Sequence, residues 1–472
     1  MSSILTETTG NSVLGKQNRK PYIYSVIIMG FFTFLFLGAV YLYDNMISFM
    51  LPEKETVLAQ NYALGVSTLG FLLYPVLRRF AKKQWRVGLT LFTAIASVLC
   101  LFIICRHVSY EITLISGIFL FLFLGVLGST VFYTSACILQ TDRYLARTVG
   151  ASYMLGILLQ FANNNIVSME TVEAVVLSIF LLVLVFLLIK AEQGRIDDSK
   201  NGNPQNKKRI TTGFLLILLI VLMTCIFSTL DNAVTLEHAA GKMDIGQWPR
   251  ILLALSGLAA GFIFDIGNRK FMNLIMCCVM MLSTISIALL NLGGPFLAGL
   301  ASFYMSAGFF AVFFTAGFME ISCYMKVPEL WAGMGRAVNN ITAALVAKAS
   351  LDLLSSGSSM ASIVITLVLF VAVIIVAAAY TSRMKTITEE ALAREAYDRN
   401  RIERIKKISE VFSFTPREAE VFDCLVNTDD SLQAVAENLY ISRRTLERYI
   451  SAIYKKTGTR SRVGLIRIYN DR

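Results

Sequence analysis

Long apolar segments recur along the chain and dominate its pattern of hydrophobic and polar positions. Stretches such as 174–189 and 362–379 are almost continuously apolar, whereas a strand of a membrane barrel alternates polar and apolar residues. A helix needs about 20 apolar residues to cross a bilayer. The pattern predicts an all-helical membrane bundle. Its twelve spans are expected near residues 22–43, 57–77, 87–105, 112–139, 146–167, 171–190, 210–230, 248–265, 271–290, 296–322, 331–353 and 360–382.

Lysine and arginine residues are unevenly distributed between the segments that connect these spans. Up to residue 382, twenty lie in one alternate set of segments and five in the other. Because basic residues accumulate on the cytoplasmic side of a membrane, this bias predicts that both termini are cytoplasmic. We therefore expect a multi-pass protein of the cell inner (plasma) membrane, embedded in the lipid bilayer.

A short motif occurs twice, first at 70–80 and again at 261–271, each time between two neighbouring spans on the expected cytoplasmic side. A polar, basic segment at 190–209 separates the sixth expected span from the seventh. The repeat predicts two six-span halves. The expected boundaries are a cytoplasmic N-terminal tail at 1–21, a first half at 22–190, a cytoplasmic linker at 191–209 and a second half at 210–382.

The second copy carries Gly261, Asp265, Arg269 and Lys270, and it resembles the cytoplasmic signature of the major facilitator superfamily. The resemblance implies that superfamily's six-plus-six helical fold over about residues 20–382. In the first copy Tyr74 stands where the signature has an acidic residue. This departure favours a sensor over an active transporter.

Polar residues at membrane depth are candidates for binding a small molecule, since such groups are costly there and often functional. The expected ligand-binding residues are Gln160, Asn163, Asn164, Asp231, Asn232, Asn339 and Asn340. Structural alternatives remain open for several polar groups. The two neighbouring asparagines could bridge helices, Lys348 could neutralise Asp352 four residues on, and Glu320 could pair with Arg336.

The composition argues against chemistry at a metal or a nucleophile. None of the eight cysteines belongs to a CxxC pair or lies near a histidine at ligand spacing, and the two histidines have no recognisable catalytic partner in sequence. We therefore expect no enzymatic activity, no cofactor and no bound metal.

The composition changes near Arg383, where apolar sequence gives way to 90 residues rich in charge. Residues 383–412 contain no glycine or proline and predict a charged helical linker. Thr415, Pro416 and Glu418 form a capping-box pattern that opens a helix through about 426. A second helix is expected from Asp430 or Ser431, and a third from the N-cap Ser442 to about Gly458. The three-residue turn between them is typical of a helix-turn-helix.

Basic residues concentrate in the last part of this tail, with nine between 442 and 472 against two acidic residues. This distribution indicates a surface for double-stranded DNA. Residues 414–470 resemble the LuxR-type helix-turn-helix domain through Thr415–Glu418, Val421, Leu425, Val435, Ala436, Leu439, Ile441, Ser442, Thr445, Ile453, Lys456, Gly458 and Arg460–Arg462. We place this domain at 413–472.

The resemblance implies roles for individual residues. Arg443, Thr445, Lys455 and Lys456 would hold phosphates, and Glu447, Arg448 and Ser451 would face base edges. Arg444, Arg460 and Arg462 complete the expected DNA-binding set. The segment 461–469 would form a surface for a homodimer through the C-terminal domain.

Together these features favour a membrane-embedded one-component transcriptional regulator that senses an unknown small molecule in its bundle and binds DNA through its tail. The first alternative is a major-facilitator-type transporter with a fused regulatory DNA-binding tail. The second is a membrane tether for DNA whose bundle has no ligand.

Overall fold

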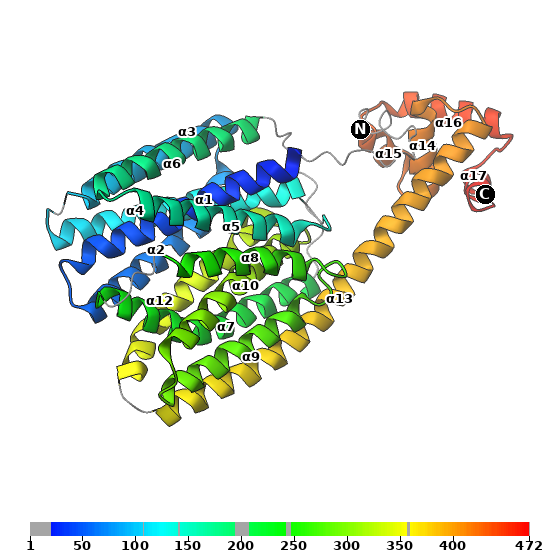
Figure 1. Cartoon of the computed structure of the whole chain (residues 1–472). Coiled ribbons are helices and arrows are strands. Elements are labelled where there is room, and N and C mark those ends of the chain that lie inside the picture. Colours follow the sequence, from blue (N-terminus) through cyan, green and yellow to red (C-terminus); the bar gives the residue numbers. More distant parts are fainter. Residues whose placement is uncertain are drawn as a thin grey trace. The chain divides into compact units, whose positions relative to one another are not determined.

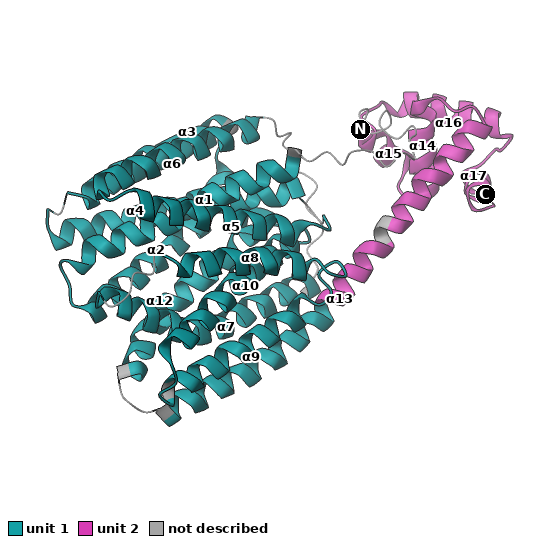
Figure 2. Ribbon diagram, in the orientation of Figure 1, with its two compact units in different colours: residues 1–383 teal, residues 384–472 magenta. Residues whose placement is uncertain are grey.

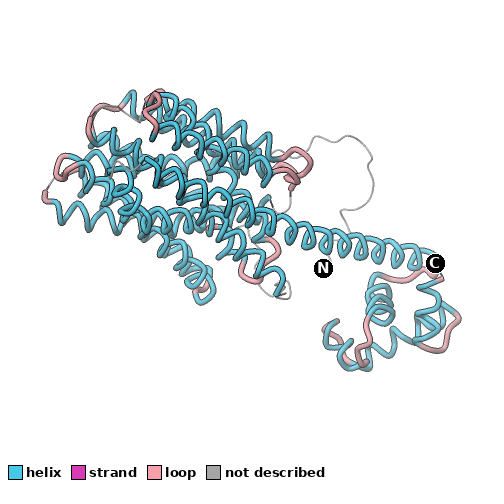
Figure 3. Tube along the Cα trace, turned by 90° about the horizontal axis from the view of Figure 1, so that it is seen from below, coloured by secondary structure: helices cyan, strands magenta, loops and turns pink. Residues whose placement is uncertain are grey.

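The computed structural model describes residues 20–106, 108–139, 142–193, 207–241, 247–355 and 359–471. Most of the expected N-terminal tail at 1–21 and residues 194–206 of the expected linker at 191–209 lie outside these ranges. The described part contains helices and loops and no strand (Figure 3). It divides into two units, Met1–Arg383 and Met384–Arg472 (Figure 2).

The first unit is a bundle of long helices packed side by side (Figure 1). Its first half consists of α1 (Lys20–Ser48), α2 (Glu53–Phe80), α3 (Lys83–Ile104), α4 (Tyr110–Leu139), α5 (Leu145–Ile166) and α6 (Glu170–Gln193). Its second half consists of α7 (Lys207–Ala239), α8 (Pro249–Phe264), α9 (Met272–Asn291), α10 (Phe296–Ser322), α11 (Pro328–Ala332), α12 (Met334–Ser355) and the start of α13 (Ser359–Val411).

Every one of the twelve apolar segments expected from the sequence is helical. In the described residues, ten helices are long and apolar enough to cross a membrane. The other two expected spans are α8, which has only 16 residues, and α12, whose asparagines and charged residues lower its hydropathy. The all-helical fold is thus confirmed, and the count of spans by length and apolarity is ten.

The two halves meet where α5 packs on α8 and α2 packs on α12. Glycines allow the close approach of α5 and α8, because a Cβ on Gly150 would lie 2.6 Å from the carbonyl oxygen of Gly257. Polar bonds join α2 to α12. Asn340 donates to the Ser67 hydroxyl over 2.9 Å, and Lys54 pairs with Asp352 over 2.7 Å. The expected partner of Asp352 was Lys348, so this ion pair instead links the halves.

The two copies of the repeated motif make different contacts. Asp265 accepts hydrogen bonds from the backbone N–H groups of Ala146 and Arg147, at 3.1 and 2.9 Å, and so caps α5 from the other half. Arg269 donates to Glu320 over 3.1 Å, in place of the expected pair between Glu320 and Arg336.

In the first copy, Arg78 donates to the Tyr74 hydroxyl over 3.2 Å and pairs with Glu192, also over 3.2 Å. These contacts lie within the first half. Asp265 of the second copy, in contrast, joins the two halves.

The second unit continues α13 and adds α14 (Pro416–Asn427), α15 (Leu432–Asn438), α16 (Arg443–Thr457) and α17 (Arg462–Asn470). The helix starts follow the sequence signals closely. Thr415 and Glu418 form the expected capping box, and Ser431 and Ser442 cap α15 and α16. Gly458 ends α16 at φ 70°, in the left-handed region that suits glycine.

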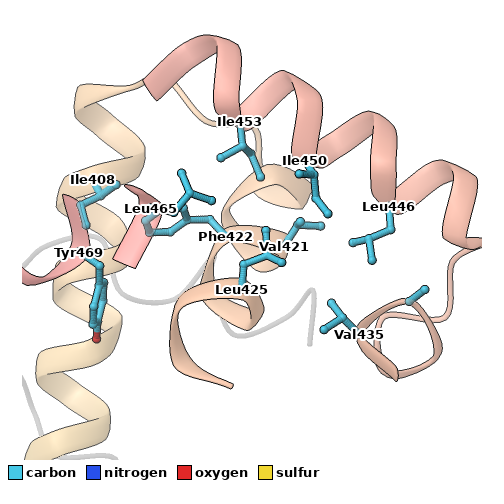
Figure 4. Packing of buried hydrophobic residues seen from close by; sticks show 11 residues of the cluster. Ile408, Val421, Phe422, Leu425, Val435, Leu446, Ile450, Ile453, Leu465 and Tyr469 are labelled. Carbon is cyan, nitrogen blue, oxygen red and sulfur yellow. The ribbon is translucent and has the colours of Figure 1, made fainter. Parts of the chain in front are cut away.

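Eleven buried residues form the core of this unit (Figure 4). They are Ile408, Val421, Phe422, Leu425, Val435, Ala436, Leu446, Ile450, Ile453, Leu465 and Tyr469. Ile408 is fully buried and Ile405 packs against the cluster, although both precede residue 413, where the sequence places the start of the domain. The last turns of α13 are therefore part of the core of the second unit.

A bidentate ion pair also fastens α13 to this domain. Arg401 donates to both carboxylate oxygens of Asp423 on α14, at 2.7 and 2.6 Å. The Arg404 guanidinium lies over the Tyr469 ring, 5.7 Å from its centroid. Upstream, α13 is supported by ion pairs at four-residue spacing such as Lys385–Glu389. One uninterrupted helix thus leads from the last apolar segment into the core of the tail.

Candidate nucleic-acid interface and membrane cavity

Helix α16 has one buried and one exposed face. Leu446, Ile450 and Ile453 point into the core (Figure 4). At 100° per residue, Arg443, Arg444, Glu447, Arg448, Ser451 and Lys455 fall within an arc of about 140° on the other side. All six side chains are exposed. The helix can therefore present one polar, basic face to a DNA groove.

Contacts divide the residues of this exposed face into two groups. Arg443 pairs with Glu447 over 3.2 Å, and the Ser451 hydroxyl donates to the carbonyl oxygen of Glu447. Arg444, Arg448 and Lys455 have no ion-pair partner among the described residues. These three cations are available to phosphates or base edges without first breaking an internal bond.

Thr445 lies at the start of the same helix, beside its cap. Its backbone N–H donates to the Ser442 hydroxyl oxygen over 3.2 Å, and the two hydroxyl groups are 2.8 Å apart. Arg460 is exposed in the loop between α16 and α17. Both positions are compatible with the DNA contacts expected of them.

Two expected DNA contacts are instead held by the domain itself. Lys456 donates to Glu418 over 2.6 Å and to the carbonyl oxygen of Ser413 over 2.9 Å. Arg462 donates to three backbone carbonyl oxygens, those of Leu425 and Asp430 at 2.7 and 2.8 Å and that of Thr428. These side chains fix α14 and the loop after it.

The ionic contact at Glu418 also affects its titration. Burial alone would raise the pKa of this carboxyl, but hydrogen bonds from Lys456 and Thr415 outweigh burial, so its pKa lies below the ordinary value of 4.5. Glu418 is 6% exposed. It is therefore an ionised, buried member of the capping box.

Helix α17 contributes Leu465 and Tyr469 to the core. Val463 is 74% exposed on the same helix, and Arg467 is also exposed. The segment expected to form a dimer surface therefore leaves an apolar and a basic side chain uncovered within one chain.

The membrane bundle contains a cavity of about 200 Å³ between its two halves. Helices α1, α2 and α5 of the first half line it, together with α7, α8, α10 and α12 of the second. Eight of its lining residues are aromatic. Phe227 and Phe310 stack with their ring centroids 4.5 Å apart, and Arg336 lies over Phe36 and Phe314, at 5.5 and 5.2 Å from their centroids.

Three of the seven expected ligand-binding residues line this cavity, namely Asp231, Asn339 and Asn340. Two of the others form bonds between helices. Gln160 donates to the carbonyl oxygen of Leu37 over 2.9 Å, and Asn232 accepts from Asn61 over 3.0 Å and donates to Ser350.

The remaining two expected residues lie at the end of α5, away from the cavity lining. Asn163 donates to Glu173 over 3.0 Å. The side-chain oxygen and nitrogen of Asn164 are both buried without a described partner. The structure therefore does not bring these asparagines together with the cavity residues.

Charged residues that the sequence did not single out as ligand-binding also line the cavity: Asp44, Arg250 and Arg336. Hydropathy assigns Asp44 and Arg250 to the edges of spans, where charge is unremarkable. Asp44 and Arg250 can be identified only from their positions on the inward faces of α1 and α8. These positions depend on how the helices pack, which the sequence alone does not show.

Comparisons with known proteins agree with this division of the chain. Residues 412–469 match the family GerE, described as bacterial regulatory proteins, luxR family. The chain matches none of the curated proteins. Its fold is similar to that of the human organic anion transporter MFSD10, with a TM-score of 0.57 and 12% identity over 77% of this chain and 100% of that one.

A second similar structure is an auto-inhibited peptide transporter of the POT family, with a TM-score of 0.52 and 9% identity over 78% of this chain and 97% of that one. At such identities the likeness concerns the fold alone. The chain is thus a multi-pass membrane protein with a major-facilitator-like bundle. Its C-terminal part is a LuxR-type helix-turn-helix domain, and neither class is typically enzymatic.

Proposed function

We propose that this protein is a membrane-embedded one-component transcriptional regulator. Its bundle senses a small molecule in the central cavity, and its tail binds double-stranded DNA sequence-specifically. The observation that supports this most strongly is α13, a single helix whose first part belongs to the bundle unit and whose last turns carry Ile408 in the DNA-binding core. A change in the bundle has a direct helical route to the DNA-binding domain.

The proposal includes a location in the inner (plasma) membrane with both termini in the cytoplasm, because the tail must reach the chromosome. The basic bias of the connecting segments supports this topology. It also includes a homodimer through the C-terminal domain, supported by the exposed Val463 on α17. A dimer would place two copies of α16 on one operator.

For DNA recognition we propose that Arg448, with Glu447 and Ser451, faces base edges, and that Arg443, Arg444, Thr445, Lys455 and Arg460 hold phosphates. Lys456 and Arg462 act indirectly, since their bonds position the other elements. Loss of a base-reading arginine costs about 1–3 kcal/mol on the correct sequence, whereas loss of a phosphate contact weakens all sequences.

The test is titration of the unit 384–472 against an operator selected from random duplexes and against a scrambled duplex, at several salt concentrations. We expect Arg448→Ala to lose roughly 5- to 150-fold on the operator and little on the scrambled duplex. Lys455→Ala should weaken both and reduce the salt slope by about one phosphate equivalent. An equal loss on both duplexes for Arg448→Ala would show that the wrong face was assigned.

The transporter alternative has one favourable observation, the similarity of the bundle to transporter folds. Uptake into proteoliposomes distinguishes it from a sensor. A sensor changes operator affinity when a ligand binds and moves no ligand across the membrane. Uptake that depends on cavity residues would support the alternative.

A further inference from the structure

The cavity presents two buried charged side chains of opposite sign that are incompletely hydrogen-bonded. Arg250 on α8 is 8% exposed, and its Nε has no hydrogen-bond partner among the described residues. Asp44 on α1 is 3% exposed, and its Oδ1 likewise has no described partner. Both residues line the cavity, and they belong to opposite halves of the bundle.

An incompletely bonded charge inside a membrane bundle is costly unless another group compensates it. The imidazole Nε2 of His238 is 4.0 Å from Oδ2 of Asp44, and the Asp231 carboxylate is close enough to act electrostatically on both Asp44 and Arg250. Oδ1 of Asp44 and Nε of Arg250 still have no described hydrogen-bond partner, so each can bond to a ligand. A ligand that supplies an acceptor to Arg250 and a donor to Asp44 would satisfy both atoms together.

The other lining residues indicate the polarity and the charge of the ligand. Phe227, Phe310, Phe303 and Tyr304 surround the cavity, and an apolar or aromatic body would contact these rings. A second cation, Arg336, and a second carboxylate, Asp231, also line it. A purely anionic ligand would face two aspartates, and a purely cationic ligand would face two arginines.

We infer that the cavity binds a small zwitterion with an apolar or aromatic body, the anionic group bonded to Arg250 and the ammonium group bonded to Asp44. The inference rests on the proposal that the bundle is sensory. Because these residues lie on opposite halves, the bound zwitterion bridges them. It therefore stabilises whichever arrangement of the halves brings Arg250 and Asp44 to the ligand's span.

The experiment measures binding to the full-length chain in nanodiscs. The probes are the twenty standard L-amino acids and, for each one that binds, its analogues without the amine and without the carboxylate. For phenylalanine these analogues are 3-phenylpropionate and phenethylamine. We expect at least one amino acid with an apolar or aromatic side chain to bind, and each analogue to bind roughly 10- to 100-fold more weakly, the loss of one charge-assisted hydrogen bond.

Two variants assign the ends of the ligand. Arg250→Gln should reduce binding of the amino acid to the level of its amine analogue and leave that analogue's affinity unchanged. Asp44→Asn should reduce binding of the amino acid to the level of its acid analogue and leave the affinity of the acid analogue unchanged. Arg106→Gln, an exposed residue outside the cavity lining, is the matched control. The thermal midpoint of each ligand-free variant and its affinity for DNA show whether it is folded.

The inference is overturned if no amino acid binds, if an acid analogue binds as tightly as its parent, or if folded Arg250→Gln and Asp44→Asn bind the parent like the control. Its failure is distinguishable from failure of the sensor proposal. If a zwitterion binds as described but leaves operator affinity unchanged, the site stands and the sensory role does not. If operator affinity responds to another class of molecule, the role stands and the zwitterion is rejected.

Discussion

Arg462 provides a quantitative test, because the sequence places it among the DNA contacts and the structure places it inside the domain. Its guanidinium donates to the carbonyl oxygens of Leu425, Thr428 and Asp430, and so joins the start of α17 to the end of α14 and the loop after it. A hydrogen bond from a charged group contributes about 1.5–3 kcal/mol. Three such bonds from one partly exposed side chain are not additive, so we expect Arg462→Ala to cost about 2–4 kcal/mol.

For a domain of this size, each kcal/mol of lost unfolding free energy lowers the midpoint of thermal unfolding by about 4–8 °C. Arg462→Ala should therefore lower the midpoint of the purified unit 384–472 by roughly 10–30 °C, measured by thermal unfolding followed by circular dichroism. Arg462→Lys should recover little, since an ammonium group cannot reach three carbonyls as a guanidinium fork does. Arg467→Ala, an exposed arginine on the same helix, is the control and should change the midpoint little.

Affinity for DNA completes this test. At a temperature where Arg462→Ala is still folded, its affinity for the operator should be close to that of the unchanged domain. An unchanged midpoint together with weaker binding to every duplex would show that Arg462 contacts DNA and does not stabilise the domain.

Three further predictions concern the same domain. The pKa of Glu418 is lowered in the folded domain, so its stabilising contribution is complete above the ordinary pKa of 4.5 and is lost as the pH falls through the pKa of the folded state. Glu418→Gln should therefore reduce the loss of thermal midpoint at acid pH, and an unchanged pH dependence in this variant would contradict the assigned role of Glu418. Tyr440 is 96% exposed and has a backbone φ of 54°, in the left-handed region that suits glycine. Tyr440→Gly should therefore relieve backbone strain and raise the free energy of unfolding in urea by about 0.5–1 kcal/mol. A lower free energy of unfolding would show that the tyrosine ring makes a stabilising contact. A double-mutant cycle on Arg401 and Asp423 should give a coupling of about 0.5–1 kcal/mol, since the pair is bidentate but partly exposed; no coupling would mean that α13 is not fastened there.

Local signals in the sequence predicted the parts of the fold that depend on neighbouring residues. The capping box at Thr415, the N-cap Ser442 and the C-terminal Gly458 define their helices through bonds that span three or four positions. The bonds of Arg462 could not be predicted in this way. Its acceptors lie 32 to 37 positions earlier and come within reach only when α14 and α17 pack together.

The contrast between local signals and long-range packing also explains why only some of the cavity residues could be predicted. Hydropathy located the helices but not the direction in which each side chain points. Asn339 and Asp231 line the cavity, whereas Gln160 donates a hydrogen bond to the backbone of α1. The sequence places all three within or at the end of an expected span and does not distinguish between them. Asp44 and Arg250 belong to helices far apart in the chain, and only the packing of the two halves places them around one space.

If the state of the bundle controls binding of DNA, a crosslink between its halves should change the affinity for the operator, and this can be measured without knowledge of the ligand. Lys54 on α2 and Asp352 on α12 form an ion pair between the halves and are about half-exposed, so cysteines at both positions can be joined by a short bismaleimide in a background without reactive native cysteines. A matched variant has the same cysteines and a Gly-Gly-Ser-Gly insertion after Leu392, upstream of Arg401.

The decisive measurement is the operator affinity of the full-length chain in nanodiscs before and after crosslinking. We expect crosslinking of Lys54→Cys with Asp352→Cys to change the dissociation constant of the operator complex. The insertion in α13 should abolish this change while the DNA-binding domain still binds the operator. An operator affinity that is the same with free and crosslinked halves would contradict control of DNA binding by the bundle.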